Sequence, residues 1–184
     1  MDEKQLIHKI LKGDTSAFGY FVDTYQDMAI TIAFRVCGNK QDAEDIVQNA
    51  FVKAFHNLHT FRSDSKFSTW FYRIVYNTAI TETRATAYNT EFVDYKQMDT
   101  SSYSDFDTMD QIEENERKAI VNEALDKMPG DEGVLLTLYY LEDNSVKEIA
   151  QITGLTDVNI KVKLHRARKR FADTVNLLMR HETI

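Results

Sequence analysis

Near the C-terminus, a run of positive charge has the composition of a nucleic-acid contact. From residue 159 to residue 171 there are six lysines and arginines and no acidic residue: Lys161, Lys163, Arg166, Arg168, Lys169 and Arg170. If this run is a helix, Lys161, Val162, His165 and Arg166 point outward, where Arg and Lys suit guanine and Val suits the thymine methyl group. The other cations suit phosphates. A solvated basic helix face is the alternative interpretation.

Aromatic residues interleaved with cations form a second pattern, between residues 61 and 84. The rings are Phe61, Phe67, Trp70, Phe71, Tyr72 and Tyr76, and the cations among them include Lys66, Arg73 and Arg84. Such a mixture can bind a single strand, because every base offers a face for stacking and every phosphate a negative charge. The same rings could simply fill a helical core, and composition does not separate the two interpretations.

Residues that could support catalysis or metal binding are few. Cys37 is the single cysteine, which excludes an intramolecular disulfide and a cysteine-based zinc site. His56 and His59 lie three residues apart, downstream of Glu44 and Asp45, but they do not form an HExxH motif. An enzyme therefore remains only an alternative, and the sequence predicts no cofactor and no metal.

The basic run is preceded by the pattern of a helix-turn-helix. Ser145 and Glu148 have the spacing of a capping box, which starts a helix. Gly154 suits the left-handed residue that ends this helix, and Thr156 suits the cap of the next one. The basic run is then the second helix of the motif, which in such motifs enters the major groove.

The N-terminal part predicts four amphipathic helices. The first ends at Gly13, Asp14 caps the second, and Gly38 follows the second. The third opens with acidic residues at 42–45, where the helix dipole favours them. The fourth follows a polar break at 59–68. Since the chain has six glycines and one proline, we predict an all-α protein.

The negative charge is concentrated in the middle of the chain. The formal net charge of −7 at first argues against a nucleic-acid binder, but Glu91–Glu116 holds nine of the 29 acidic residues and one of the 22 basic ones. Helical periodicity is absent from residue 89 to residue 110. We therefore predict two helical domains, at 1–88 and 113–184, joined by a flexible acidic linker at 89–112. No apolar run is long enough to span a membrane and no signal peptide is evident, so we expect a cytosolic protein.

Both domains resemble the extracytoplasmic-function (ECF) group of bacterial RNA polymerase sigma factors. The first resembles sigma domain 2 through Asp42–Gln48 and through Phe67–Ile74 followed by Asn77. The second resembles sigma domain 4 through Ser145–Leu155 and Ile160–Arg168. Two such motifs in this order, joined by a linker of this size, are far more specific than a lone helix-turn-helix.

The resemblance implies a subunit that binds core RNA polymerase and directs promoter-specific initiation without catalysis of its own. It implies that the β′ clamp helices bind the polar face of the third helix, which carries Asp42, Asp45, Gln48 and Asn49. It implies a surface that recognises the −10 element and captures a base flipped from the non-template strand, formed by Phe61, Lys66, Arg73, Tyr76 and Asn77. It implies that the −35 duplex is bound by Lys161, Val162, Lys163, His165, Arg166 and Arg168, while domain 4 rests on the β flap.

Three departures from the family pattern affect the expected contacts with polymerase and DNA. Asn49 stands where many members have Glu, and Val162 replaces a usual serine. The segment after the fourth helix's aromatic turns, Thr81–Ala87, carries a single cation where members often have an arginine-rich tail, which predicts weak phosphate anchoring. The acidic linker would pass near the RNA exit channel, either mimicking nucleic-acid charge or serving as a solubilising tether.

Resemblance also implies an anti-sigma factor as a partner, although no residue identifies it. A stand-alone helix-turn-helix regulator is the alternative function. It would leave the Asp42–Gln48 and Phe67–Asn77 motifs unexplained.

Overall fold

A computed structural model describes residues 2–89 and 114–181, and all regular secondary structure in these ranges is helical. The predicted all-α class is therefore confirmed. The predicted linker at 89–112 lies, apart from its first residue, outside the described residues. The N-terminal half contains α1 (Glu3–Leu11), η1 (Thr15–Phe18), α2 (Gly19–Cys37), α3 (Lys40–Asn57), η2 (Leu58–Thr60) and α4 (Phe67–Asn89). The C-terminal half contains α5 (Glu114–Asp126), α6 (Gly130–Leu136), the π-helical turn η4 (Thr137–Leu141), α7 (Val146–Thr153) and α8 (Asp157–His181).

The four expected N-terminal helices are present, but two begin at different residues. Asp14 precedes the short 3-10 helix η1 and makes no capping hydrogen bond to a backbone amide, so α2 begins only at Gly19. The helix α3 begins at Lys40, because the Asn39 side chain accepts hydrogen bonds from the amides of Gln41 and Asp42 at 2.8 and 3.3 Å. Asp42 therefore lies inside the first turn.

The predicted helix-turn-helix is present in the C-terminal half. Ser145 caps α7, with its amide donating to the Glu148 carboxylate at 2.8 Å, so the capping box is complete. Gly154 ends α7 with a φ of +75°, in the left-handed region that glycine adopts at little cost. The hydroxyl of Thr156 accepts from the amide of Asn159 at 3.3 Å, which caps α8. The elements that position α8 thus follow directly from local sequence.

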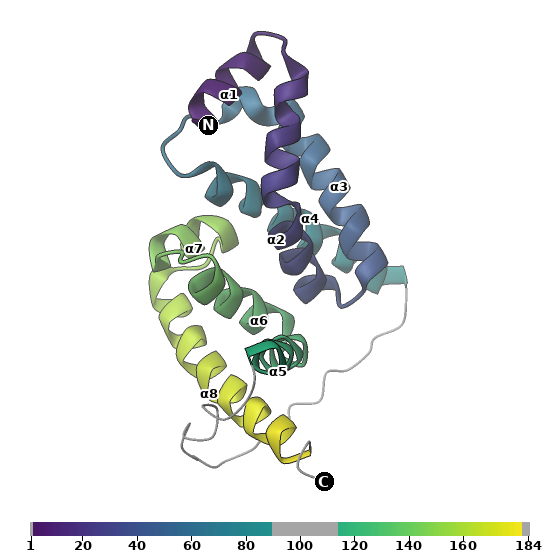
Figure 1. The fold of residues 1–184 in the computed structure, drawn as a ribbon, viewed down its shortest axis with the longest axis vertical. Helices are drawn as coiled ribbons and strands as arrows, with labels where there is room; N and C mark the ends of the chain where they lie inside the picture. Colours follow the sequence, from purple (N-terminus) through teal and green to yellow (C-terminus); the bar gives the residue numbers. More distant parts are fainter. Residues whose placement is uncertain (1, 90–113, 182–184) are drawn as a thin grey trace.

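The two halves pack against each other along α4 and α7, and along α2 and α6 (Figure 1). One continuous hydrophobic cluster includes Phe71 of α4, Leu138 of η4 and Ile149 of α7, all fully buried. At the edge of this interface the guanidinium of Arg35, whose side chain is 4% exposed, donates to Asp126 at 2.9 Å. Burial lowers the pKa of Arg35, while the charge of Asp126 and its hydrogen bond act in the opposite direction.

Close backbone approach completes this interface. Gly130, the first residue of α6, lies against the backbone of Arg35 and Val36, and a Cβ atom at Gly130 would overlap the carbonyl oxygen of Arg35. The structure is therefore a closed arrangement of the two halves, with α7 of the helix-turn-helix lying on α4.

Candidate nucleic-acid interface

The outer face of α8 carries the side chains predicted to contact duplex DNA. Lys161, Val162, His165 and Arg166 are all exposed. Their neighbours Ile160, Leu164 and Ala167 are at most 2% exposed and hold the opposite face of the helix in the core. Val162, 46% exposed, is an apolar residue in the middle of a cationic face. Three donors and one apolar group thus lie together on one helix face, which is the chemistry of base readout in a major groove.

Two of the other predicted DNA-binding cations are already engaged within the protein. The ammonium of Lys163, which is half-buried, donates to Asp131 of α6. The guanidinium of Arg168 lies 5.4 and 5.6 Å from the ring centroids of Tyr139 and Tyr140. Both cations would have to give up or share these contacts in order to bind phosphate.

The capping box of α7 fixes the helix against which α8 packs, and it predicts a dependence on pH. We expect Ser145→Ala to lower the free energy of unfolding by about 1 kcal/mol. The hydrogen bonds from Ser145 and the nearby Lys66 lower the pKa of Glu148. Its stabilisation is therefore present above the ordinary glutamate pKa and disappears as pH falls through the lower folded value. Urea unfolding from pH 7 to pH 3 measures both effects.

The control for this prediction is Glu148→Gln, whose side chain does not titrate. Its stability difference from the wild type should be largest at neutral pH and shrink below about pH 4. A difference that stays constant to pH 3 would contradict the role of the Glu148 charge.

The aromatic residues of the second pattern divide into core and surface. Phe67, Phe71 and Tyr72 are at most 2% exposed and belong to the core, so for these rings the core interpretation is correct. Tyr72 donates to the carboxylate of Glu142 in the other half of the protein, and burial raises the pKa of both groups. Phe61 and Trp70 are only partly buried and contact each other with ring centroids 5.4 Å apart.

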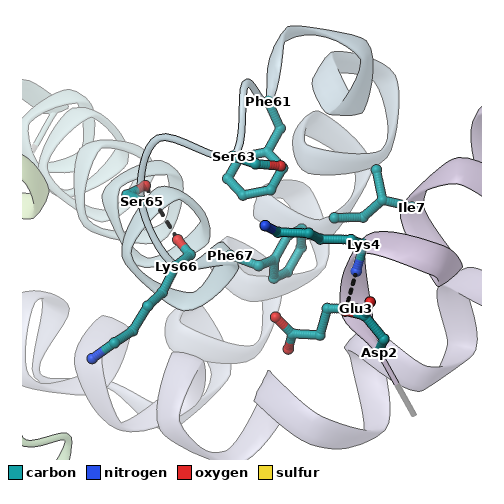
Figure 2. Close-up of a pocket in the computed structure, with 9 residues that line it drawn as sticks. All are labelled: Asp2, Glu3, Lys4, Ile7, Phe61, Ser63, Ser65, Lys66 and Phe67. Carbon is teal, nitrogen blue, oxygen red and sulfur yellow. Dashed lines mark hydrogen bonds between the residues drawn. The ribbon is translucent and has the colours of Figure 1, made fainter.

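A pocket of about 250 Å³ lies between the N-terminus of α1 and the loop that precedes α4 (Figure 2). The rings of Phe61 and Phe67 and the side chain of Ile7 provide its apolar surface. Its polar lining consists of Asp2, Glu3, Lys4, Ser63, Ser65 and Lys66. The sequence motifs identified Phe61 and Lys66 but missed the α1 residues, because no local pattern links residues 2–4 to residues 61–67.

The remaining predicted −10 residues lie along α4, away from this pocket. Arg73 and Asn77 are exposed and one turn apart. Arg73 also lines a second hollow, beside Trp70 and Gln151 of α7. Tyr76 is half-buried toward the C-terminal half, and burial followed by the charge of Asp131 raises its pKa. Phe61 lines both hollows, the first with Lys66 and the second with Arg73, whereas Tyr76 and Asn77 lie further along α4 and line neither.

On α3, Asp42, Asp45, Gln48 and Asn49 are exposed together on the polar face. The amide of Asn49 donates to the carboxylate of Glu82 on α4 at 3.3 Å, and the ammonium of Lys53 lies 4.0 Å from the same carboxylate. A glutamate at position 49 would place two negative charges side by side. Asn49 instead donates a hydrogen bond to Glu82 and adds no negative charge beside it.

The groups considered for metal binding or catalysis do not converge. The Nδ1 atom of His59 lies 3.0 Å from the carbonyl oxygen of His56, and both residues are exposed. Within residues 2–89 and 114–181, no three His, Cys, Asp or Glu side chains are grouped as metal ligands. Cys37 is half-buried, and burial raises the pKa of its thiol, which favours the unreactive protonated form. None of the helices in these ranges has the length and apolarity needed to cross a membrane.

Comparisons with known proteins match two family models to two parts of the chain. Residues 21–87 match the family model for sigma-70 region 2, and residues 111–171 match that for sigma-70 region 4. The chain is 30% identical to the RNA polymerase sigma-H factor of Pseudomonas aeruginosa, over 97% of this chain and 96% of that protein. It is 29% identical to the ECF RNA polymerase sigma factor SigW of Bacillus subtilis, covering 90% of this chain and 92% of the relative.

A solved structure has the same fold. The sigma factor RpoE of Bartonella quintana, crystallised in complex with the anti-sigma factor NepR, superposes with a TM-score of 0.64 at 20% identity. The match covers 86% of this chain and 96% of that one. The fold therefore extends over both halves.

Proposed function

This chain belongs to the extracytoplasmic-function group of RNA polymerase sigma factors, which bind core polymerase and direct promoter-specific initiation, and we propose how its two halves divide that work. The C-terminal half binds the −35 element as duplex, and the N-terminal half captures the opened −10 strand. The exposed face of α8, held by the capped α7, is the observation that carries the proposal. Sigma factors as a family are not enzymes; this one acts through binding energy alone, and it acts in the cytoplasm.

At the −35 element, the face of Lys161, Val162, His165 and Arg166 enters the major groove. Lys163 and Arg168 support it from the sides, through phosphate contacts. Because Val162 offers only an apolar contact, a thymine methyl group is its favoured partner. The β flap of the polymerase binds this half on a surface away from the DNA.

At the −10 element, Arg73, Tyr76 and Asn77 contact the separated strand along α4, and a flipped base enters the pocket beside Phe61 and Lys66. Extrusion of a base costs a few kcal/mol, which stacking and hydrogen bonds in a pocket can repay. The exposed face of Asp42, Asp45, Gln48 and Asn49 on α3 binds the β′ clamp helices. These side chains are free of the core, so they are available to a partner.

The closed arrangement cannot bind both promoter elements at once. Elements centred at −35 and −10 are about 25 base pairs apart, or about 85 Å of B-form DNA at about 3.4 Å per base pair. In the closed chain α7 lies directly on α4. The two halves, 1–88 and 113–184, must therefore separate on the polymerase, with 89–112 as the tether between them. An anti-sigma factor that favours the closed arrangement would keep the protein inactive, and we propose such a partner here.

The direct test is transcription in vitro with bacterial core polymerase and a library of promoter sequences. A sigma factor should produce initiation at a restricted set of promoters, and core alone should not. Absence of initiation above core alone would overturn the proposal. A stand-alone regulator would instead bind promoter duplex tightly without polymerase, which a gel-shift measurement with the free chain distinguishes.

Substitutions in the two halves should have separable effects. We expect Arg166→Ala to lose roughly 10-fold or more in the preference for the −35 base that it contacts, because a good base contact contributes about 1–3 kcal/mol. Lys161→Ala should act similarly at a neighbouring base. Asn77→Ala should impair strand opening, measured by permanganate reactivity, while −35 preference stays unchanged. If Asn77→Ala changed the −35 preference as much as Arg166→Ala does, the proposed division of work between the two halves would be contradicted.

A further inference from the structure

We propose that Lys4, on the N-terminal helix α1, is a specificity-determining residue that contacts the base captured in the pocket. The inference rests on the proposed function of the N-terminal half, and it adds a helix that no family motif includes: the matched region 2 begins at residue 21. The ligand is an unpaired base of the opened strand, and the chemistry that Lys4 offers selects for a base with a carbonyl oxygen.

The position of Lys4 supports this role. Its side chain lines the pocket, and in Figure 2 its ammonium end extends toward the loop that carries Phe61 and Ser63. The hydroxyl of Ser63, a residue with a φ of +59°, lies beside the Phe61 ring in Figure 2. A flat ring placed there would meet apolar faces and, at its edge, a charged donor.

The other lysine of the pocket is directed elsewhere. Lys66 belongs to the pocket lining, but its ammonium points away in Figure 2 and forms an ion pair with Glu148 of α7 at 3.0 Å. By contrast, no side chain in the described part of the protein forms an ion pair or accepts a hydrogen bond from the Lys4 ammonium. The cation that this pocket presents to a ligand is therefore Lys4.

The backbone of Lys4 is held in place by three contacts of α1. The carboxylate of Asp2 accepts from the Lys4 amide at 3.1 Å. The hydroxyl of Tyr25 on α2 donates to the carboxylate of Glu3. Leu6 is 4% exposed and Ile7 is 7% exposed, so both anchor the helix in the core. A fixed backbone with a free side-chain end is what positioned recognition of a ligand requires.

The chemistry of an ammonium limits what it can select. It has three donors and no acceptor, so it pairs with carbonyl oxygens and ring nitrogens but not with an exocyclic amino group. Guanine, thymine and cytosine each have a carbonyl oxygen, whereas adenine has none. Adenine offers ring nitrogens only, and its exocyclic amino group, beside N1 and N7, repels an ammonium, so we expect Lys4 to disfavour adenine at the captured position by up to roughly 10-fold, the effect of one hydrogen bond to a charged group.

The experiment uses holoenzyme assembled from core polymerase and the full chain. The probes are fork-junction DNAs with a duplex −35 element and a single-stranded non-template −10 segment, in which each position carries each of the four bases. We compare the wild type with Lys4→Met, which keeps the length and apolar stem, and with Lys4→Arg, which keeps the charge. Lys9→Met is the control, because Lys9 is exposed on the same helix outside the pocket.

The expected result is that Lys4→Met loses the discrimination against adenine at one position, by roughly 10-fold, while Lys4→Arg retains part of it and Lys9→Met all of it. If Lys4→Met preserves every base preference, or weakens all probes equally with a smaller salt dependence, the proposal is overturned. In the second case Lys4 would be a phosphate contact. A wild-type holoenzyme that fails to initiate at any promoter would instead contradict the proposed function.

Discussion

Replacing Gly130 with alanine is expected to separate the two halves of the free protein while leaving each half folded. The added Cβ would overlap the carbonyl oxygen of Arg35, which belongs to the backbone of α2 and cannot rotate away. Overpacking of this kind costs about 1–3 kcal/mol. That cost applies only when α6 lies on α2, so the equilibrium shifts toward the open arrangement by roughly 5- to 150-fold.

Small-angle scattering of the free chain measures this separation as a larger radius of gyration, and circular dichroism should report unchanged helix content. The matched control is Gly19→Ala, because Gly19 is helical and a Cβ there meets no atom within 4 Å. An unchanged radius for Gly130→Ala would contradict the closed arrangement in solution. Loss of helix content would show instead that Gly130 serves the fold of its own half.

The second large effect is expected at Phe71, where alanine should lower the free energy of unfolding by about 3–5 kcal/mol. Phe71 is 0% exposed, and its ring stacks on Phe51 with centroids 4.5 Å apart. It also contacts Phe67 and Tyr25. Since a domain is stable by only about 5–15 kcal/mol, the variant should unfold at much lower urea concentration.

Phe61→Ala provides the comparison, because this ring is partly buried and lines the pocket. We expect it to cost much less stability than Phe71→Ala but to impair capture of the opened strand, since a stacking contact contributes roughly 1–3 kcal/mol. Urea unfolding and permanganate footprinting separate the two effects. Equal losses of stability for both variants would show that the aromatic residues form one core without a binding function.

Local sequence determined much of this protein. The capping box at Ser145 and Glu148, the left-handed Gly154 and the cap at Thr156 each act within a few residues, so the helix-turn-helix and the exposed face of α8 were predictable. The order of apolar residues predicted which faces are buried. Helix starts were predicted less accurately: the sequence opened the third helix at the acidic residues 42–45, whereas α3 begins at Lys40 and is capped by Asn39.

Residues of the same type have different roles in this protein, and the tertiary structure decided which role each one has. Phe61 and Phe71 are the same amino acid in one aromatic cluster, but one lines a pocket and the other is fully buried. Lys66 lines the pocket beside Phe67, but its ammonium forms an ion pair with Glu148 of the other half. The cation left to the pocket is Lys4, which lies more than fifty residues earlier in the chain. Periodicity and caps are properties of a few neighbouring residues. Burial and charge pairing depend on residues that meet only when distant helices pack, so the sequence by itself determined the helices and their faces, and the packing of the two halves determined which side chains remain free to bind.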